Sequence, residues 1–164
     1  MKLDAHKSSV AKAYGLASGG HDNPALRFFS QGAECLVDFA GVLPGQKILD
    51  VASGTGHAAF YAGRKVTGSQ GSVIGIDIAE EMVNLANAHA NSLADCNVRF
   101  LLMDGEHTDF SDSEFDVVIC SYGVFFSSGN GQRDQRVEAD RQGRWLGELV
   151  RLWRNGIPAA IRSV

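Results

Sequence analysis

The feature of this chain best suited to chemistry is a carboxylate that ends an apolar run and is followed by a glycine turn. Asp50 ends the apolar run 47–49, and Gly54 and Gly56 follow it. Glycines let the backbone approach a ligand closely, and the next helix can direct free N–H groups at the same spot. A helix start alone attracts anions, but Asp50 adds a negative charge there. The combination favours a nucleoside that carries positive charge over a bare pyrophosphate.

Two further acidic positions follow later apolar runs. Asp77 comes 23 positions after Gly54, where an acid can accept hydrogen bonds from both hydroxyls of a ribose. The alternative is that Asp77 only caps the next helix. Asp104 and Gly105 follow the third run, and a carboxylate there can accept an amino hydrogen of adenine. The alternative for this pair is an ordinary polar turn.

The carboxylate at position 50 separates two candidate cofactors. Gly54, Gly56 and Ala59 satisfy the loose G-x-G-x-x-G/A pattern of dinucleotide sites, but Asp50 would repel a pyrophosphate. S-adenosylmethionine instead carries a cationic sulfonium and a cationic ammonium. We therefore expect S-adenosylmethionine as the cofactor, with an NAD-type oxidoreductase as one alternative. A solvated Asp50 that merely caps its turn is the interpretation without a ligand.

Hydrophobic periodicity predicts the elements that position these residues. Four apolar runs that end at polar or glycine signals are typical of buried parallel strands, and helical patterns lie between them. This alternation predicts a Rossmann-like, doubly wound α/β fold with strand order 3-2-1-4, helices on both faces, and ligands beyond the carboxyl ends of the strands. The predicted strands are 47–51, 73–78, 98–103 and 115–121, and the predicted helices are 24–38, 57–66 and 79–94.

Composition excludes several other classes of protein. With 164 residues, 45% of them hydrophobic, the chain can bury a core, and its net charge of −4 argues against a nucleic-acid or anionic-membrane binder. Cys35, Cys96 and Cys120 form neither a zinc pattern nor a disulfide framework, so we expect buried free thiols and no bound metal. Because no apolar run is long enough to span a membrane and the first residues are not typical of a signal peptide, we expect a cytoplasmic protein.

The order of these motifs resembles that of a known family. The segments ILDVASGTG, VIGIDIAEEMVNLA and VRFLLMDGEHTDFSDSEFDVVICSYGVFF follow the order found in class I S-adenosylmethionine-dependent methyltransferases. The subgroup that they resemble is the C-methyltransferases of ubiquinone and menaquinone biosynthesis, over residues 10–126. This resemblance implies methyl transfer from S-adenosylmethionine to a small-molecule, quinone-like acceptor.

The resemblance also implies where the cofactor binds. The implied residues are Asp50, Ala52, Gly54 and Gly56 at the methionine end, Asp77, Ile78 and Met82 at the ribose and adenine, Asp104 and Gly105 at the adenine edge, and Ser121 facing the cofactor from the fourth strand. Ala13–Tyr14 and 27–29 are similar to the N-terminal lid of the family, although Gly15 stands where an acid often follows the tyrosine.

The expected reaction asks little of side chains. A sulfonium is already activated, so alignment of nucleophile, methyl group and sulfur supplies most of the catalysis. We therefore predict no catalytic side chain. Tyr122, at the end of the fourth strand, either orients a substrate or packs, and His57 and His107 are interpreted as turn or helix residues rather than bases.

Residue usage changes abruptly after Phe126. All Phe, Tyr, His, Lys and Met residues precede position 127, whereas both Trp and seven of the ten Arg follow it. There are 8 basic and 15 acidic residues up to Phe126, but 7 basic and 4 acidic residues beyond it. We predict that residues 1–126 form an incomplete cofactor-binding domain and that residues 127–164 are a tail foreign to the family. A frame-shifted reading of a longer methyltransferase gene is the hypothesis for that tail.

The tail carries its own expectations. An apolar stripe that includes Trp145, Leu149 and Trp153 predicts an amphipathic helix over 137–154, with disorder as the alternative. If the tail leaves the fourth strand uncovered, the exposed sheet edge would favour oligomers. A truncated, non-catalytic module that binds S-adenosylmethionine is then the alternative to an enzyme.

Overall fold

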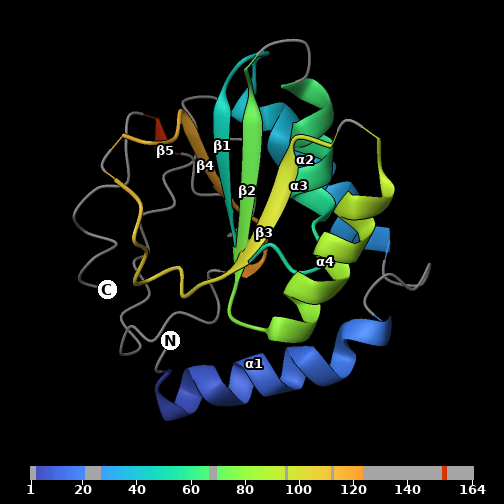
Figure 1. Ribbon diagram of the computed structural model, residues 1–164, viewed down its shortest axis with the longest axis vertical. Coiled ribbons are helices and arrows are strands. Elements are labelled where there is room, and N and C mark those ends of the chain that lie inside the picture. The colour runs from blue at the N-terminus through green and yellow to red at the C-terminus, as the bar shows by residue number, and fades with distance from the viewer. Residues whose placement is uncertain are drawn as a thin grey trace, which may run out of the picture.

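A parallel sheet forms the centre of the computed structural model, which describes residues 3–20, 27–66, 70–94, 96–111, 113–123 and 153–154 (Figure 1). Its four parallel strands are β1 (Lys47–Val51), β2 (Ser72–Asp77), β3 (Val98–Leu102) and β4 (Val117–Cys120). They lie in the order β3-β2-β1-β4, and each neighbouring pair is parallel. The predicted strands, their order and the Rossmann-like class of the sheet are thereby confirmed.

A fifth, very short strand extends the sheet. β5 (Trp153–Arg154) runs antiparallel to β4, with Trp153 opposite Val118 and Arg154 opposite Val117. The helix predicted over 137–154 is therefore wrong at its last two residues, because their backbone completes the open edge of β4. The remainder of that predicted helix lies outside the described residues.

Three helices cover one face of the sheet. α2 (Arg27–Ala40), α3 (His57–Lys65) and α4 (Glu80–Ser92) begin or end within a few residues of their predicted bounds. Their apolar sides pack on alternate residues of the strands, as the two-residue repeat of a strand requires. This core includes Leu36, Val37, Ile48, Ala59, Ala62, Val73, Ala86, Phe100 and Ile119, all nearly or fully buried.

The opposite face of the sheet is packed differently. Its buried residues form a small cluster of Leu49, Ile74, Ile76, Phe115 and Val118. The segment that follows β3 supplies part of the cover, since the ring of Phe110 lies edge-on to that of Phe115 at 4.9 Å. Within the described ranges no helix packs on this face, so the second helical layer that we predicted is not found there.

An N-terminal helix lies across the carboxyl ends of the strands. α1 (Ala5–Ala17) crosses the lower end of the sheet in Figure 1, and a short turn of 3-10 helix, η1 (Ser18–Gly20), follows it. The side chain of Asp4 caps α1 by accepting a hydrogen bond from the N–H of Lys7 at 2.8 Å. Hydrophobic periodicity does not predict this helix, because its inward residues are Lys7 and Gly15 while Leu16 is 81% exposed.

Two expectations from composition have different outcomes. Cys35 is exposed, while Cys96 and Cys120 are only half-buried, so the prediction of three buried thiols is wrong although all three are free. Cys35 lies on the outer side of α2, away from the apolar side that packs on the sheet. None of the helices in the described ranges is both long and apolar enough to cross a membrane.

Candidate functional site

The turn between β1 and α3 forms the floor of the site. Gly54 and Gly56 adopt positive φ angles of 54° and 95°, in the left-handed region that glycine tolerates best. A Cβ atom on Gly56 would also collide with the rings of Phe60 and Phe100. Ala52 adopts a φ of 54° although it is not glycine, so the backbone turns sharply as soon as β1 ends.

Asp77 ties this turn to the neighbouring strand. One carboxylate oxygen accepts a hydrogen bond from the N–H of Gly54 at 2.8 Å, and the other accepts one from the N–H of Ala79 at 2.9 Å. The second bond closes a turn two residues long just before α4, whose N-cap is Ala79 and not, as the capping alternative had it, Asp77. Asp77 therefore holds the glycine turn in place while its carboxylate borders the site.

Asp50 is buried without a partner. It is 1% exposed, and among the described residues neither of its carboxylate oxygens has a hydrogen-bond partner. Burial raises the pKa of Asp50 to about 8; the nearby backbone N–H of Ala59 offsets part of this shift, and the charge of Asp77 adds to it. An unpaired buried carboxyl is costly, which marks this position as a place for a cationic or hydrogen-donating ligand.

A cavity opens above this floor, at the carboxyl ends of the strands. The turn after β1 and the end of β2 bound it on the side of the sheet, and α1 and α2 bound it on the other side. The predicted site residues on its wall are Asp50, Ala52, Gly54, Asp77, Ile78 and Ser121. The wall also contains Val10, Ala11, Tyr14, Phe29, Ala33, Ser53, His57, Ala58, Ala79, Tyr122 and Gly123, which were not among the predicted cofactor contacts.

Four predicted contacts lie off this wall. Gly56 belongs to the turn but not to the cavity wall, and Met82 is fully buried in α4. Asp104 and Gly105 lie on the turn after β3 and are not part of the cavity wall. Their assignment to the cofactor remains a prediction that rests on the family resemblance.

The N-terminal helix covers the side of the cavity that faces away from the sheet. Tyr14 of α1 lies on the cavity wall, where burial and then the charge of Asp77 raise the pKa of its hydroxyl. Gly15 packs against Glu81 of α4, and a Cβ atom at this position would overlap the Glu81 carboxylate. A residue with a Cβ atom at this position would displace the Glu81 carboxylate, which is the flexible end of that side chain.

Aromatic rings form the side wall near Ser121. The rings of Phe29 and Tyr122 meet edge-on at 5.0 Å, and the Tyr122 hydroxyl donates a hydrogen bond to the carbonyl of Phe28 at 3.2 Å. Tyr122 has a φ of 64°, which turns its side chain toward α2. Tyr122 therefore packs against α2, as one of its two interpretations predicts, and it also lines the cavity.

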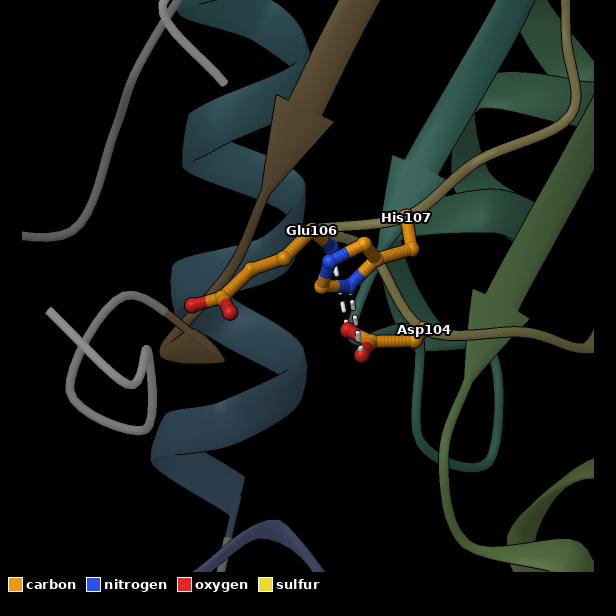
Figure 2. Close-up of side chains that lie close together, drawn as sticks. All are labelled: Asp104, Glu106 and His107. Carbon is orange, nitrogen blue, oxygen red and sulfur yellow. Dashed lines mark hydrogen bonds and ion pairs between the residues drawn. The ribbon is translucent and has the colours of Figure 1, made fainter. Parts of the chain in front are cut away.

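On the turn after β3, Asp104 lies in a network of charges. Figure 2 shows Asp104, Glu106 and His107 on the turn after β3, with Asp104 bonded to the His107 ring at 3.2 Å and to the N–H of Glu106 at 3.0 Å. The ammonium of Lys7, from α1, contacts Asp104 at 2.7 Å and Glu106 at 2.5 Å. The side chains of Asp104, Glu106 and His107 are close enough to share a metal ion. Lys7, however, already supplies a cation to both carboxylates.

Comparison with known proteins identifies the family. The profile of a family described as a methyltransferase domain matches residues 48–139, which is more than half of the chain. The aklanonic acid methyltransferase DauC of Streptomyces sp. (strain C5) is 36% identical over 126 residues, which are 77% of this chain and 57% of that protein. This chain belongs to the class I S-adenosylmethionine-dependent methyltransferases.

Two further methyltransferases show how far the likeness extends. The 2-phytyl-1,4-naphtoquinone methyltransferase of a Synechocystis species is 38% identical over 89 residues, 54% of this chain and 37% of that one. The crystal structure of an S-adenosylmethionine-dependent methyltransferase from Aquifex aeolicus has 29% identity and a TM-score of 0.56, covering 65% of this chain and 55% of its own. The chain thus spans from about a third to somewhat over half of the length of these methyltransferases.

Proposed function

We propose that this methyltransferase chain binds S-adenosylmethionine in the cavity above the glycine turn, with the methionine end of the cofactor over Asp50. The observation that carries the proposal is the buried Asp50 carboxyl, which has no hydrogen-bond partner among the described residues. S-adenosylmethionine brings an ammonium and a sulfonium to this place. A cation there would favour the ionised form of Asp50 and offset the cost of its burial.

The remainder of the cofactor is proposed to follow the strand ends. Asp77 lies on the cavity wall at the end of β2, where its carboxylate is proposed to accept hydrogen bonds from ribose hydroxyls. Ile78 continues the wall toward the adenine. Asp104 and Gly105 are proposed to meet the adenine edge.

The methyl acceptor is proposed to be a small, quinone-like molecule held against Phe29 and Tyr122. Flat rings pack well against aromatic side chains in offset or edge-on contacts. The names of the two curated methyltransferases above specify aklanonic acid and a phytyl naphthoquinone as what they methylate. When bound over Asp50, S-adenosylmethionine would supply an activated methyl group to an acceptor held against Phe29 and Tyr122.

Calorimetry with two ligands tests the cofactor. We expect S-adenosylhomocysteine to bind and NAD not to bind, because the pyrophosphate of NAD would meet Asp50 and Asp77. Binding of NAD in preference to S-adenosylhomocysteine would overturn the proposal. Subsequent turnover assays with quinone-like acceptors distinguish an enzyme from a chain that only binds the cofactor.

We also propose that residues 127–164 are a frame-shifted reading within a longer methyltransferase gene. The change in residue usage after Phe126 supports this proposal. The family match ends at residue 139, thirteen residues after the predicted boundary. Sequencing the coding DNA tests it, and lack of an overlapping methyltransferase reading frame downstream would overturn it.

A further inference from the structure

The N-terminal helix is held over the site at both of its ends. Near its C-terminus, Gly15 packs against Glu81 on α4. Near its N-terminus, Lys7 reaches the turn after β3 and forms ion pairs with Asp104 and Glu106. Between these anchors, α1 contributes Val10, Ala11 and Tyr14 to the cavity wall.

The Lys7 anchor is a buried ion pair. The side chain of Lys7 is 5% exposed and that of Asp104 is 9% exposed, although Lys7 is 97 positions away in the sequence. Burial opposes the charge of Lys7, but hydrogen bonds to Asp104 and Glu106 more than offset this, so the pKa of Lys7 is raised. The anchor therefore remains charged throughout the neutral pH range.

This ammonium covers the carboxylate expected to recognise adenine. One oxygen of Asp104 receives Lys7 and the His107 ring, and the other receives the N–H of Glu106. An adenine amino group is likewise an N–H donor, and it would need the same carboxylate. The cavity reaches Asp50 and Asp77 but does not include Asp104 or Gly105 on its wall.

We propose that Lys7 is a latch on the adenine side of the site: its ammonium occupies Asp104, and the base displaces it when the cofactor binds. This inference rests on the proposed function. The N-terminal part of α1 must then move away from the turn after β3, while the Gly15 contact with α4 can act as the pivot. The apparent affinity for the cofactor is reduced by the fraction of molecules in which the latch is closed.

Chemical labelling of the wild-type chain tests the latch directly. Lys7 is acylated with an N-hydroxysuccinimide ester, with and without saturating S-adenosylhomocysteine, and the rates are read by peptide mass spectrometry. A buried amine reacts slowly, so we expect S-adenosylhomocysteine to accelerate the labelling of Lys7 by about tenfold if the latch is mostly closed without it. Lys65, which pairs with Asp38 on the surface of α2 and α3, is the internal control and should not change.

A charge-balanced pair of substitutions provides an independent test. Lys7→Met combined with Glu106→Gln removes one cation and one anion, so the net charge around Asp104 is preserved. We expect this double variant to bind S-adenosylhomocysteine about fivefold to tenfold more tightly than Glu106→Gln alone, since no ammonium competes for Asp104. Equal or weaker binding would contradict competition.

The outcomes separate the latch from the proposed function. If wild-type protein binds S-adenosylhomocysteine but Lys7 labelling stays constant or slows, the latch is overturned and the cofactor assignment stands. If neither the wild type nor the double variant binds it, the cofactor assignment itself fails. Binding by the double variant but not by the wild type would support a latch that is almost always closed.

Discussion

Asp50 and Asp104 are two buried acids at the same edge of the sheet, and they are stabilised in opposite ways. Asp50 is 1% exposed and has no hydrogen-bond partner in the described part of the chain; burial raises its pKa to about 8. Asp104 is 7% exposed; burial acts in the same direction there, but hydrogen bonds led by that from Lys7 outweigh it and lower its pKa. The partner therefore decides the charge of a buried acid, and the proposed cofactor would supply to Asp50 the cation that Lys7 supplies to Asp104.

Lys7→Met would remove the ammonium that pairs with Asp104 and leave it, like Asp50 in the described part of the chain, buried without a lysine partner. Removing the ammonium leaves two carboxylates close together and largely buried, so we expect the free energy of unfolding to fall by about 3–5 kcal/mol. Urea unfolding followed by circular dichroism measures the loss. His107→Ala is the matched control, because the His107 side chain is 78% exposed and its loss should cost under about 0.5 kcal/mol. Similar losses for both variants would show that the buried pair is not what stabilises this turn.

Asp50→Asn tests the other member of the comparison. The amide keeps the shape of the side chain but cannot become anionic, so we expect the affinity for S-adenosylhomocysteine to fall by about 1.5–3 kcal/mol. Calorimetry measures the change. Asp38→Asn, on the exposed side of α2, serves as the control and should bind normally. Undiminished binding by the Asp50 variant would remove Asp50 from the cofactor site.

Asp77→Ala asks whether an acid that is partly used by the backbone still binds ribose. The substitution removes the acceptor for the N–H groups of Gly54 and Ala79 as well as any contact with ribose hydroxyls. We expect cofactor affinity to fall by about 1–3 kcal/mol. Asp77→Asn retains one acceptor oxygen and should lose less. Unchanged affinity in the Ala variant would mean that Asp77 only holds backbone turns in place.

The pKa of Asp50 predicts how stability varies with pH. Its folded-state pKa of about 8 lies above the ordinary value of 3.8, so the folded chain holds a proton that the unfolded chain has released between these values. Asp50 therefore reduces stability as pH rises through this window, by at most about 1.4 kcal/mol per pH unit. The difference in unfolding free energy between wild type and Asp50→Asn, measured at pH 5.5 and 7.5, isolates this contribution. A difference that is the same at both pH values would contradict the raised pKa.

The sequence predicted those parts of the fold in which local pattern and packing agree. β1, β2 and β4 are short apolar runs with consecutive buried residues, β3 alternates buried and exposed residues, and α3 and α4 follow turn signals, so periodicity located them to within about two residues. α1 was missed because its inward side carries a lysine and a glycine rather than a stripe of apolar residues. Nor could periodicity show that Trp153 and Arg154 pair with β4, since that pairing depends on the open edge of a distant strand.

The site shows the same division. Asp50, Gly54 and Asp77 lie at strand ends next to recognisable turns, so their types and spacing were sufficient to bring them to one cavity. The ion pair between Lys7 and Asp104 could not be predicted from local spacing, because Lys7 is almost a hundred positions away in the sequence. Phe29 and Tyr122 resembled ordinary packing residues until α2 and the end of β4 were placed side by side.

The left-handed backbone at Ala52 and Tyr122 has a consequence for protein engineering. Three non-glycine residues have positive φ in the described chain, and these two border the cavity, whereas Ser113 lies on a turn outside it. A left-handed conformation costs a side-chain-bearing residue about 1–2 kcal/mol, so glycine at any of the three would relieve strain. A screen that selects only for heat resistance would therefore favour Ala52→Gly, which alters the cavity wall as it relieves the strain, whereas Tyr122→Gly would also lose the ring contacts with α2. Ser113→Gly offers the same relief while leaving the cavity wall intact.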